Sequence, residues 1–343
     1  MPAGHLLKEG TYKDKPLSDD EMWSAFAYLF SSKSVNDTSY KFGFLKSILD
    51  NLYNVDDKLV LTFDQLFSKF AEIYWNLVLK HHIRQKNPGK LNRQSELESA
   101  LLYGKEKYGI FEDIPFESLS DEMRIDICHR VKMKCKNNVV GALFADLGEL
   151  FYSFSKSGEW IQINPRMYKF VCNHKVAIEK LNYYEWAKFL EKVNEDRAVD
   201  HLLSKIDEST MRTRSGLAYY RDILFQEFEN KCFYCGKQVT KQSVEVDHFI
   251  PWSFIKDDQL WNFVLACPEC NNRKRDKLAQ IYFLDKISER NEVMIERDQR
   301  HYADSGRKIR MIYTWAQKNG YNEIWTPGKK AKSLPDSVPS AID

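Results

Sequence analysis

The chain has 343 residues, of which 43% are hydrophobic, 29% charged and 14% aromatic, and its formal net charge is +2. This composition supports packed cores and excludes global disorder, and the length allows two domains or one large domain with extensions. The small net charge excludes an overall basic field, so a nucleic acid would have to be met by local basic patches.

The sequence predicts neither export nor membrane insertion. Its first residues, MPAGHLLKEGTYKDK, lack the apolar core of a signal peptide. No apolar run reaches the roughly 18 residues of a membrane span. The seven cysteines are an odd number, which favours metal ligation or free thiols over a disulfide framework. We therefore expect a cytoplasmic protein without a membrane partner.

The first part of the chain, residues 1–205, is predicted to be mainly helical. In TFDQLFSKFAEIYWNLVLK the apolar residues recur at helical spacing from Phe63 to Val78, and Thr62 with Gln65 forms a capping box. The segment YYEWAKFLEKVN repeats the pattern with a narrower apolar stripe. Such aromatic stripes are typical of a buried core.

The second part of the chain has a different pattern of predicted secondary structure. A helix is predicted from Ser215 to about Glu229, followed by short β-like segments and tight turns as far as Cys270. Helix returns in CNNRKRDKLAQIYFLDKISERN and again in RKIRMIYTWAQKNG, where Gly320 suits a C-terminal cap. The last residues, 327–343, are rich in Pro, Ser and Lys and are predicted to be disordered.

Four cysteines form the pairs CFYC (Cys232, Cys235) and CPEC (Cys267, Cys270). A two-residue gap lets both thiolates of a pair reach one ion, and two pairs complete a tetrahedral Zn²⁺ site. Gly236 suits the tight turn after the first pair. A single pair would also be typical of a redox site, whereas two pairs favour zinc. A zinc ion with four cysteine ligands has no open position, so this ion would be structural.

A second group of polar residues lies between and directly after the cysteine pairs. SVEVDHF predicts a strand that ends at Asp247 and His248, NFVLAC predicts a returning strand after Asn262, and CNNRKRDKL starts a helix. Asp247 would then face Asn271, and two oxygen ligands with water suit Mg²⁺ or Mn²⁺. His248 beside this ion would take a proton from water. A structural Asp-His pair is the alternative reading.

Basic residues near this group predict contacts to a phosphate backbone. Solvated surface charge is the alternative explanation for them. The candidates are Arg273, Arg275 and Lys277 at the start of the helix, and Arg212, Arg214 and Arg221 upstream of the first cysteine pair.

The order Cys-x-x-Cys, Asp-His-x-x-Pro, Asn, Cys-x-x-Cys-Asn-x-x-Lys resembles the HNH (ββα-metal) endonuclease family in its four-cysteine zinc form. VDHFIPWSFIKDDQLWNFVL and NNRKRDK are similar to the HNH domain of RNA-guided CRISPR effector nucleases, and the whole chain is more similar to bacterial restriction or phage-defence HNH endonucleases. The resemblance implies that His248 is the general base and that Asp247 and Asn271 are ligands of Mg²⁺. It also implies that Asn262 braces the loop and orients His248, and that Lys274 contacts the scissile region.

The resemblance also implies an organisation and a function. The expected fold is α+β: a helical specificity or regulatory region over residues 1–205, a zinc-stapled, treble-clef-like ββα-metal nuclease domain over 206–290, a helical extension over 291–326 and the disordered tail. The expected function is Mg²⁺-dependent (or Mn²⁺-dependent) DNA cleavage in restriction or anti-phage defence, by a homodimer or with a defence-system partner protein. The alternative is a non-catalytic, zinc-stabilised DNA-binding or adaptor module.

Overall fold

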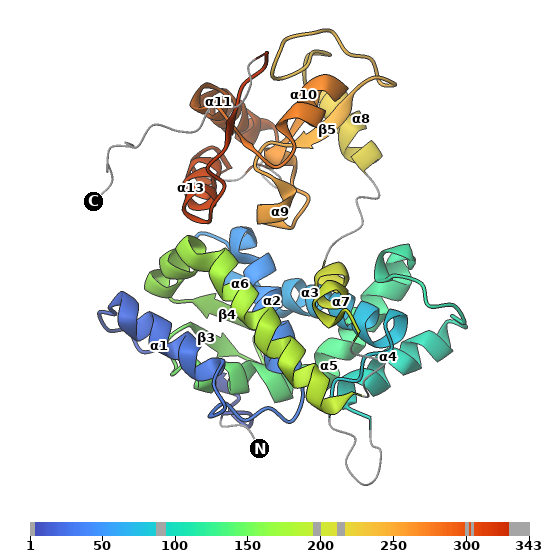
Figure 1. Ribbon diagram of the computed structural model, residues 1–343, viewed down its shortest axis with the longest axis vertical. Coiled ribbons are helices and arrows are strands. Elements are labelled where there is room, and N and C mark those ends of the chain that lie inside the picture. Colours follow the sequence, from blue (N-terminus) through green and yellow to red (C-terminus); the bar gives the residue numbers. More distant parts are fainter. Residues whose placement is uncertain are drawn as a thin grey trace. The chain divides into compact units, whose positions relative to one another are not determined.

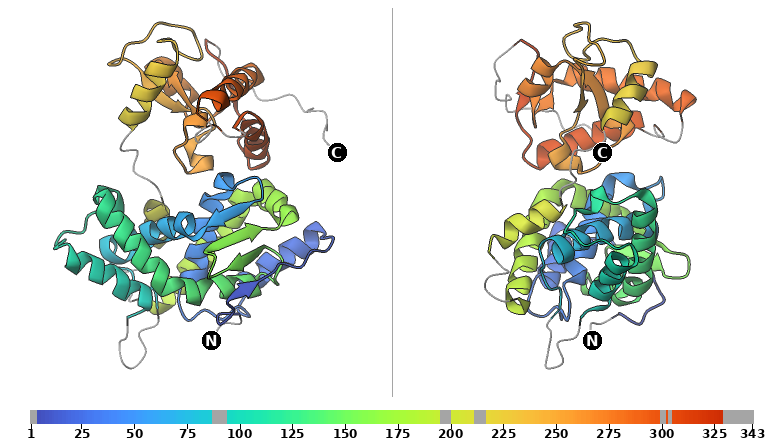
Figure 2. Two further views of the ribbon diagram at one scale, coloured as in Figure 1. Left: turned by 180° about the vertical axis from the view of Figure 1, so that it is seen from behind. Right: turned by 90° about the vertical axis from the view of Figure 1, so that its right-hand side faces the viewer.

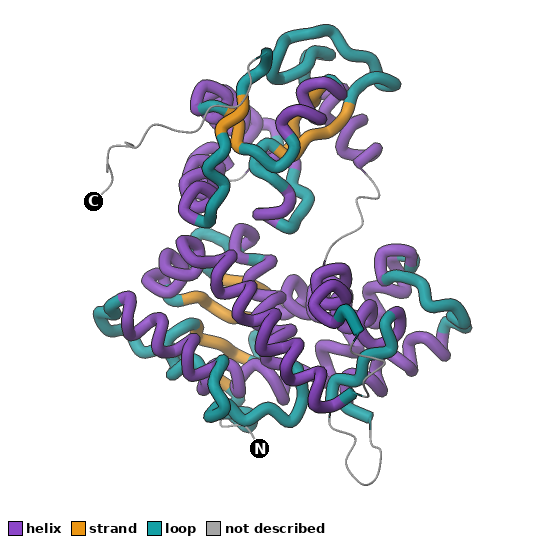
Figure 3. Tube along the Cα trace, viewed as in Figure 1, coloured by secondary structure: helices purple, strands orange, loops and turns teal. Residues whose placement is uncertain are grey.

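The computed structural model describes residues 4–86, 94–194, 200–210, 217–298, 302 and 305–328. The chain divides into two compact units, Met1–Thr213 and Arg214–Asp343, and each is described by itself (Figure 1). Helices dominate both units and the strands are short, so the predicted α+β class is confirmed (Figure 3). No helix among the described residues is long and apolar enough to cross a membrane.

The first unit is built mainly of helices. The α-helices are α1 (Asp19–Leu29), α2 (Tyr40–Asp50), α3 (Phe63–Trp75), α4 (Glu96–Lys107), α5 (Asp121–Asp146), α6 (Pro165–Val193) and α7 (Leu202–Thr210). The shorter turns are η1 (Leu52–Asn54), the π-helical η2 (Asn76–Lys80) and η3 (Phe116–Ser118). Helix α7 crosses the predicted boundary at residue 205 and packs on α3 and α6.

Helix α3 begins and packs as its sequence predicts. Thr62 accepts a hydrogen bond from the backbone N–H of Gln65, and the Gln65 side chain accepts one from the Thr62 N–H, which confirms the capping box. The apolar face of α3 is buried, and the rings of Phe70 and Tyr74 lie 4.6 Å apart. Burying each such side chain stabilises the fold by about 1.5–3 kcal/mol.

The first unit also contains a four-stranded antiparallel sheet that the helical periodicity does not predict. Its strands are β1 (Glu9–Gly10), β2 (Val60–Thr62), β3 (Tyr152–Ser155) and β4 (Trp160–Ile163), in the order β1-β3-β4-β2. The strands have two to four residues each, too few for a reliable alternation of polar and apolar positions. All four residues of β3 are buried, including Ser153 and Ser155, so neither face of this strand is exposed.

The second unit combines two small sheets with helices. Its elements are α8 (Leu217–Glu227), β5 (Glu245–His248), α9 (Trp252–Ile255), η5 (Leu260–Asn262), β6 (Phe263–Ala266), α10 (Pro268–Lys274), β7 (Leu278–Ala279), α11 (Ile281–Arg297), α13 (Ser305–Lys318) and β8 (Ile324–Trp325). Strands β5 and β6 are antiparallel, whereas β7 and β8 are parallel. Helices α11 and α13 pack side by side (Figure 2).

The predicted strands and the final helix of this unit are confirmed, but the helix after Cys270 is not continuous. Helix α10 ends at Lys274, Arg275 takes a positive φ of 51°, and β7 intervenes before α11. Leu278 pairs with Ile324, a contact with a distant segment that a local pattern cannot reveal. At the end of α13, Gly320 has a φ of 95°, as its predicted capping role requires.

Candidate functional site

The four cysteines of the two predicted pairs come together at one point. Their Sγ atoms all lie within 4.8 Å of one another, and the Sγ atoms of Cys235 and Cys267 are 3.8 Å apart. A tetrahedral zinc ion with Zn–S bonds of about 2.3 Å would separate its sulfurs by about 3.8 Å. The cluster therefore fits a closed structural Zn²⁺ site.

Backbone hydrogen bonds shape this cluster. Gly236 has a φ of 73°, and its N–H donates to the carbonyl of Cys232 at 2.9 Å, which closes the first turn. The N–H of Phe233 donates to the carbonyl of Leu265 in β6. Cys267 occupies the N-cap position of α10, where its carbonyl accepts from the N–H of Asn271. Burial raises the pKa of the Cys270 thiol, and a bound cation would offset this by favouring the thiolate. An ion bound by the four cysteines would connect the turn from Cys232 to Gly236 and strand β6 with the start of α10.

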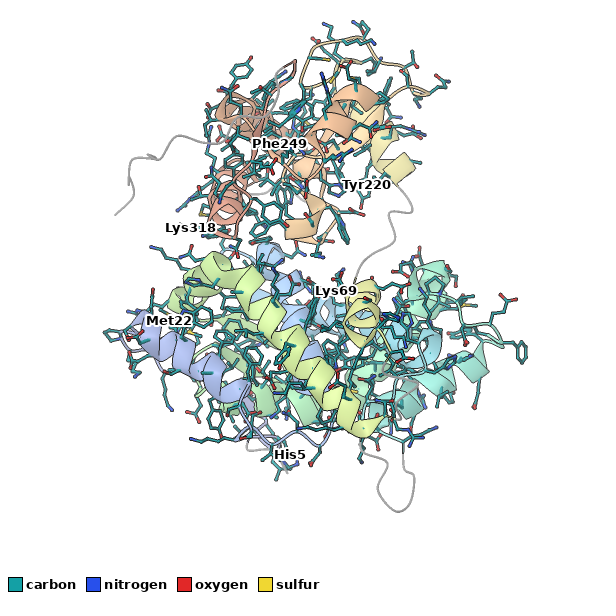
Figure 4. The ribbon with its side chains drawn as sticks, in the orientation of Figure 1. His5, Met22, Lys69, Tyr220, Phe249 and Lys318 are labelled. Atoms are coloured by element: carbon teal, nitrogen blue, oxygen red, sulfur yellow. The ribbon has the colours of Figure 1, made fainter. Side chains whose placement is uncertain are left out.

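The β5–β6 hairpin presents the Asp-His pair. Asp247 lies opposite Val264 and His248 opposite Phe263 in the antiparallel register. The rings of His248 and Phe263 are 4.6 Å apart, and Tyr220 of α8 packs on Phe263 at 4.9 Å. Figure 4 draws these side chains and labels Tyr220, together with Phe249, which follows β5. One side of the His248 ring is thus held by aromatic packing.

Asp247 is buried among polar partners. Its carboxylate accepts a hydrogen bond from the Tyr234 hydroxyl and lies 3.0 Å from the Lys274 ammonium, which also donates to the carbonyl of His248 at 2.8 Å. Burial, and then the Asp247 charge, raise the pKa of Tyr234 well above its usual range, so this hydroxyl stays a donor. Lys274, predicted to contact the scissile region, is completely buried here and pairs with Asp247.

His248 has a carboxylate partner that the sequence analysis did not identify. Its Nε2 lies 2.8 Å from Asp258 Oδ1, and the two side chains are 8% and 19% exposed. An ionised carboxylate can only accept, so Nε2 must carry the proton of this bond. In the neutral ring, Nδ1 is then the nitrogen with the free electron pair.

Asn262 braces the loop that follows His248. It is fully buried; its Oδ1 accepts from the N–H of Ile250 at 2.9 Å and its Nδ2 donates to the carbonyl of Ile250 at 3.0 Å. The carbonyl of Asn262 also accepts from Phe249. Its side chain bonds to the backbone, whereas the ring of His248 bonds to Asp258.

Asn271 is bound to the strand that carries Asp247. Its Nδ2 donates to Glu245 Oε2 at 2.6 Å. Glu245 and Asp247 are two residues apart in β5, so their side chains lie on the same face of the strand. The helix and the strand thereby bring Asn271 and Asp247 to one face of the hairpin.

The predicted phosphate-binding cations have different surroundings. Arg273 is exposed and pairs with Glu269 at 3.2 Å, and the exposed Arg275 donates to the carbonyl of Asn272. Lys277 pairs with Glu323 at 2.8 Å, and Arg221 lies 3.9 Å from Asp222. Arg212 and Arg214 lie outside the described residues.

Four residues with a part in this site were not identified from the sequence: Tyr234, Glu245, Asp258 and Arg290. Arg290 of α11 donates to the carbonyls of Phe263 and Trp261, and burial lowers its pKa to about 10. Glu245 stands at the polar position of the alternating strand pattern, a signal that could have identified it. The contacts of the other three depend on loop paths and on α11, which no local pattern specifies.

Comparison with known proteins identifies the same segment. A sequence model described as HNH endonuclease matches residues 232–280, which contain the four cysteines, β5, β6 and α10. No curated protein and no solved structure matches the chain. Residues 232–280, with their four-cysteine cluster, therefore match the HNH endonuclease family, which suggests that the protein is a nuclease.

Proposed function

We propose that the second unit hydrolyses phosphodiester bonds in DNA with the help of a divalent cation, Mg²⁺ or Mn²⁺. The observation that carries this proposal is the HNH-matched segment, in which Asp258 holds His248 through Nε2 and Asp247 directly precedes His248 in β5. An oriented base next to oxygen ligands is what metal-assisted hydrolysis of a phosphodiester requires.

The donor atoms fit a hard cation. Asp247 offers carboxylate oxygens and Asn271 an amide oxygen, the ligand types that Mg²⁺ and Mn²⁺ prefer. A carboxylate has about four acceptor positions. Tyr234 and Lys274 therefore leave Asp247 with capacity for a cation. We assign Asp247 and Asn271 as the residues that would hold it.

His248 would supply the base. Its Nδ1 takes a proton from the attacking water, and the nearby Asp258 carboxylate stabilises the imidazolium that forms. The water oxygen forms a bond to phosphorus while the bond from phosphorus to the 3′ oxygen breaks. A divalent ion held by Asp247 and Asn271 would polarise the phosphate and would stabilise the leaving 3′ oxygen, which takes up a proton from water. Asn262 keeps the loop after His248 in place through Ile250.

The remaining residues would support binding and folding. We assign Cys232, Cys235, Cys267 and Cys270 to a structural Zn²⁺ ion. We also assign the exposed Arg273 and Arg275, together with Lys277 and Arg221, to contacts with the DNA backbone. For the first unit we propose a role in specificity, partner docking or control, in restriction or anti-phage defence. One such site cuts one strand, so a double-strand break would require a homodimer or two successive nicks.

A second candidate is a non-catalytic, zinc-stabilised DNA-binding or adaptor module. The buried ion pair between Lys274 and Asp247 favours it, because the lysine neutralises the carboxylate without any metal. This module would need zinc to bind DNA and would be indifferent to Mg²⁺.

Parallel binding and cleavage assays distinguish the two candidates. The zinc-loaded protein is incubated with supercoiled plasmid in the presence and absence of Mg²⁺ or Mn²⁺, and binding to a labelled duplex is measured under the same conditions. Nicking or linearisation that requires the divalent ion supports the nuclease. Metal-independent binding without any cleavage supports the adaptor.

A further inference from the structure

The bond between Glu245 and Asn271 fixes which end of an amide faces the proposed metal site. Asn271 Nδ2 donates to Glu245 Oε2 at 2.6 Å, a short distance that is typical of a charge-assisted hydrogen bond. Glu245 is half-buried, and it lies on the same strand face as Asp247.

The two ends of an asparagine side chain have nearly the same shape but opposite chemistry. Oδ1 can bind a cation, whereas the NH₂ group can only donate hydrogen bonds. Half a turn about the last side-chain bond exchanges them. With Glu245 as the neighbour only one orientation is favourable, because the other would set Oδ1 of Asn271 against a carboxylate oxygen. Oδ1 is therefore directed away from Glu245.

We propose that Glu245 is a positioning residue of the metal site, which holds Asn271 with its carbonyl oxygen available to the cation. This inference rests on the proposed function, which assigns Asp247 and Asn271 as the cation's ligands. Residues that bond to metal ligands without touching the metal commonly set the orientation of those ligands, and their loss lowers metal affinity.

The direct test is Mn²⁺ affinity, measured by electron paramagnetic resonance on the full-length, zinc-loaded protein without DNA. Glu245→Ala should weaken Mn²⁺ binding about 10–100-fold, because Asn271 loses the bond that orients it. Glu245→Gln should stay close to wild type, since the glutamine carbonyl can accept the same hydrogen bond. Glu269→Gln is the matched control: it removes an exposed acid from α10 and should leave the affinity unchanged.

A double substitution provides a second test, in which changing Glu245 is expected to raise Mn²⁺ affinity instead of lowering it. Asn271→Asp should weaken Mn²⁺ binding, because the new carboxylate faces that of Glu245. Combining Asn271→Asp with Glu245→Gln should restore affinity above that of the single variant, since the glutamine amide can donate to the new carboxylate. A residue with only a structural role would not produce this reversal of sign.

Each outcome bears on the inference. Wild-type Mn²⁺ affinity in Glu245→Ala would overturn it, and so would an equal loss in Glu245→Gln and Glu245→Ala, which would make Glu245 a direct ligand. If the wild type cleaves plasmid while Glu245→Ala binds Mn²⁺ normally, only this inference fails. If the wild type neither binds Mn²⁺ nor cleaves DNA, the proposed function fails with it.

Discussion

At the scale of single residues, Asp258 sets the orientation of His248 through a 2.8 Å hydrogen bond. Asp258→Ala removes both the bond and the charge that would stabilise the imidazolium, so we expect kcat to fall about tenfold or more with little change in KM. Asp258→Asn should lose less, because the amide oxygen can still accept from Nε2. The measurement is plasmid nicking at saturating and limiting DNA concentrations.

The exposed Asp276 provides the control for this experiment. Asp276→Ala removes the same charge from the same unit and should nick plasmid at the wild-type rate. Wild-type kcat in Asp258→Ala would show that the aromatic packing of His248 is sufficient to position it.

Asn262 makes a structural contribution at the same scale. Asn262→Ala leaves both the N–H and the carbonyl of Ile250 without their partners in a buried loop. We expect the free energy of unfolding of the zinc-loaded protein to fall by about 2–4 kcal/mol. Urea denaturation monitors this, with the exposed Asn272→Ala as a control that should change stability little. A loss no greater than that of Asn272→Ala would contradict the bracing role.

At the scale of elements, the four-cysteine cluster connects the turn from Cys232 to Gly236 and strand β6 with helix α10. Cys267→Ser removes one ligand, and structural zinc in small domains contributes on the order of 10 kcal/mol to folding. We therefore expect this variant to lose bound zinc and the tertiary structure of the second unit, as measured by metal analysis and near-ultraviolet circular dichroism. Cys128→Ser, in α5 of the first unit, should retain zinc. Zinc retention and an unchanged spectrum in Cys267→Ser would contradict the assignment.

Elements defined by local pattern were predictable, and those defined by distant contacts were not. The capping box of α3 and the alternation in β5 each depend only on residues that are close together in the sequence. The break between α10 and α11 follows from the pairing of β7 with β8, and the sheet of the first unit joins β1 to β3 across most of that unit. The cysteines and the Asp-His pair were identifiable from spacing. The contact of Glu245 with Asn271 depends on how α10 packs on the hairpin, and the contact of Asp258 with His248 depends on the path of the loop after β5.

At the scale of the whole molecule, each of the two units has a buried core of its own. Only the second contains the four-cysteine cluster. We therefore expect calorimetry to show two unfolding transitions, of which a zinc chelator lowers or abolishes only one. The same experiment on Phe70→Ala, which leaves a cavity in the first unit, should lower the other transition and destabilise that unit by about 3–5 kcal/mol. A single transition that both changes shift equally would contradict independent cores.

The central claim is that His248 is the base of a metal-dependent nuclease. The most direct measurement is the nicking of supercoiled plasmid in Mg²⁺ or Mn²⁺ by the wild type, by His248→Ala shown to retain its zinc, and by His129→Ala, which changes an exposed histidine of the first unit. We predict nicking by the wild type and His129→Ala, and a loss of at least about 100-fold in His248→Ala. Equal nicking by all three proteins would contradict the role of His248.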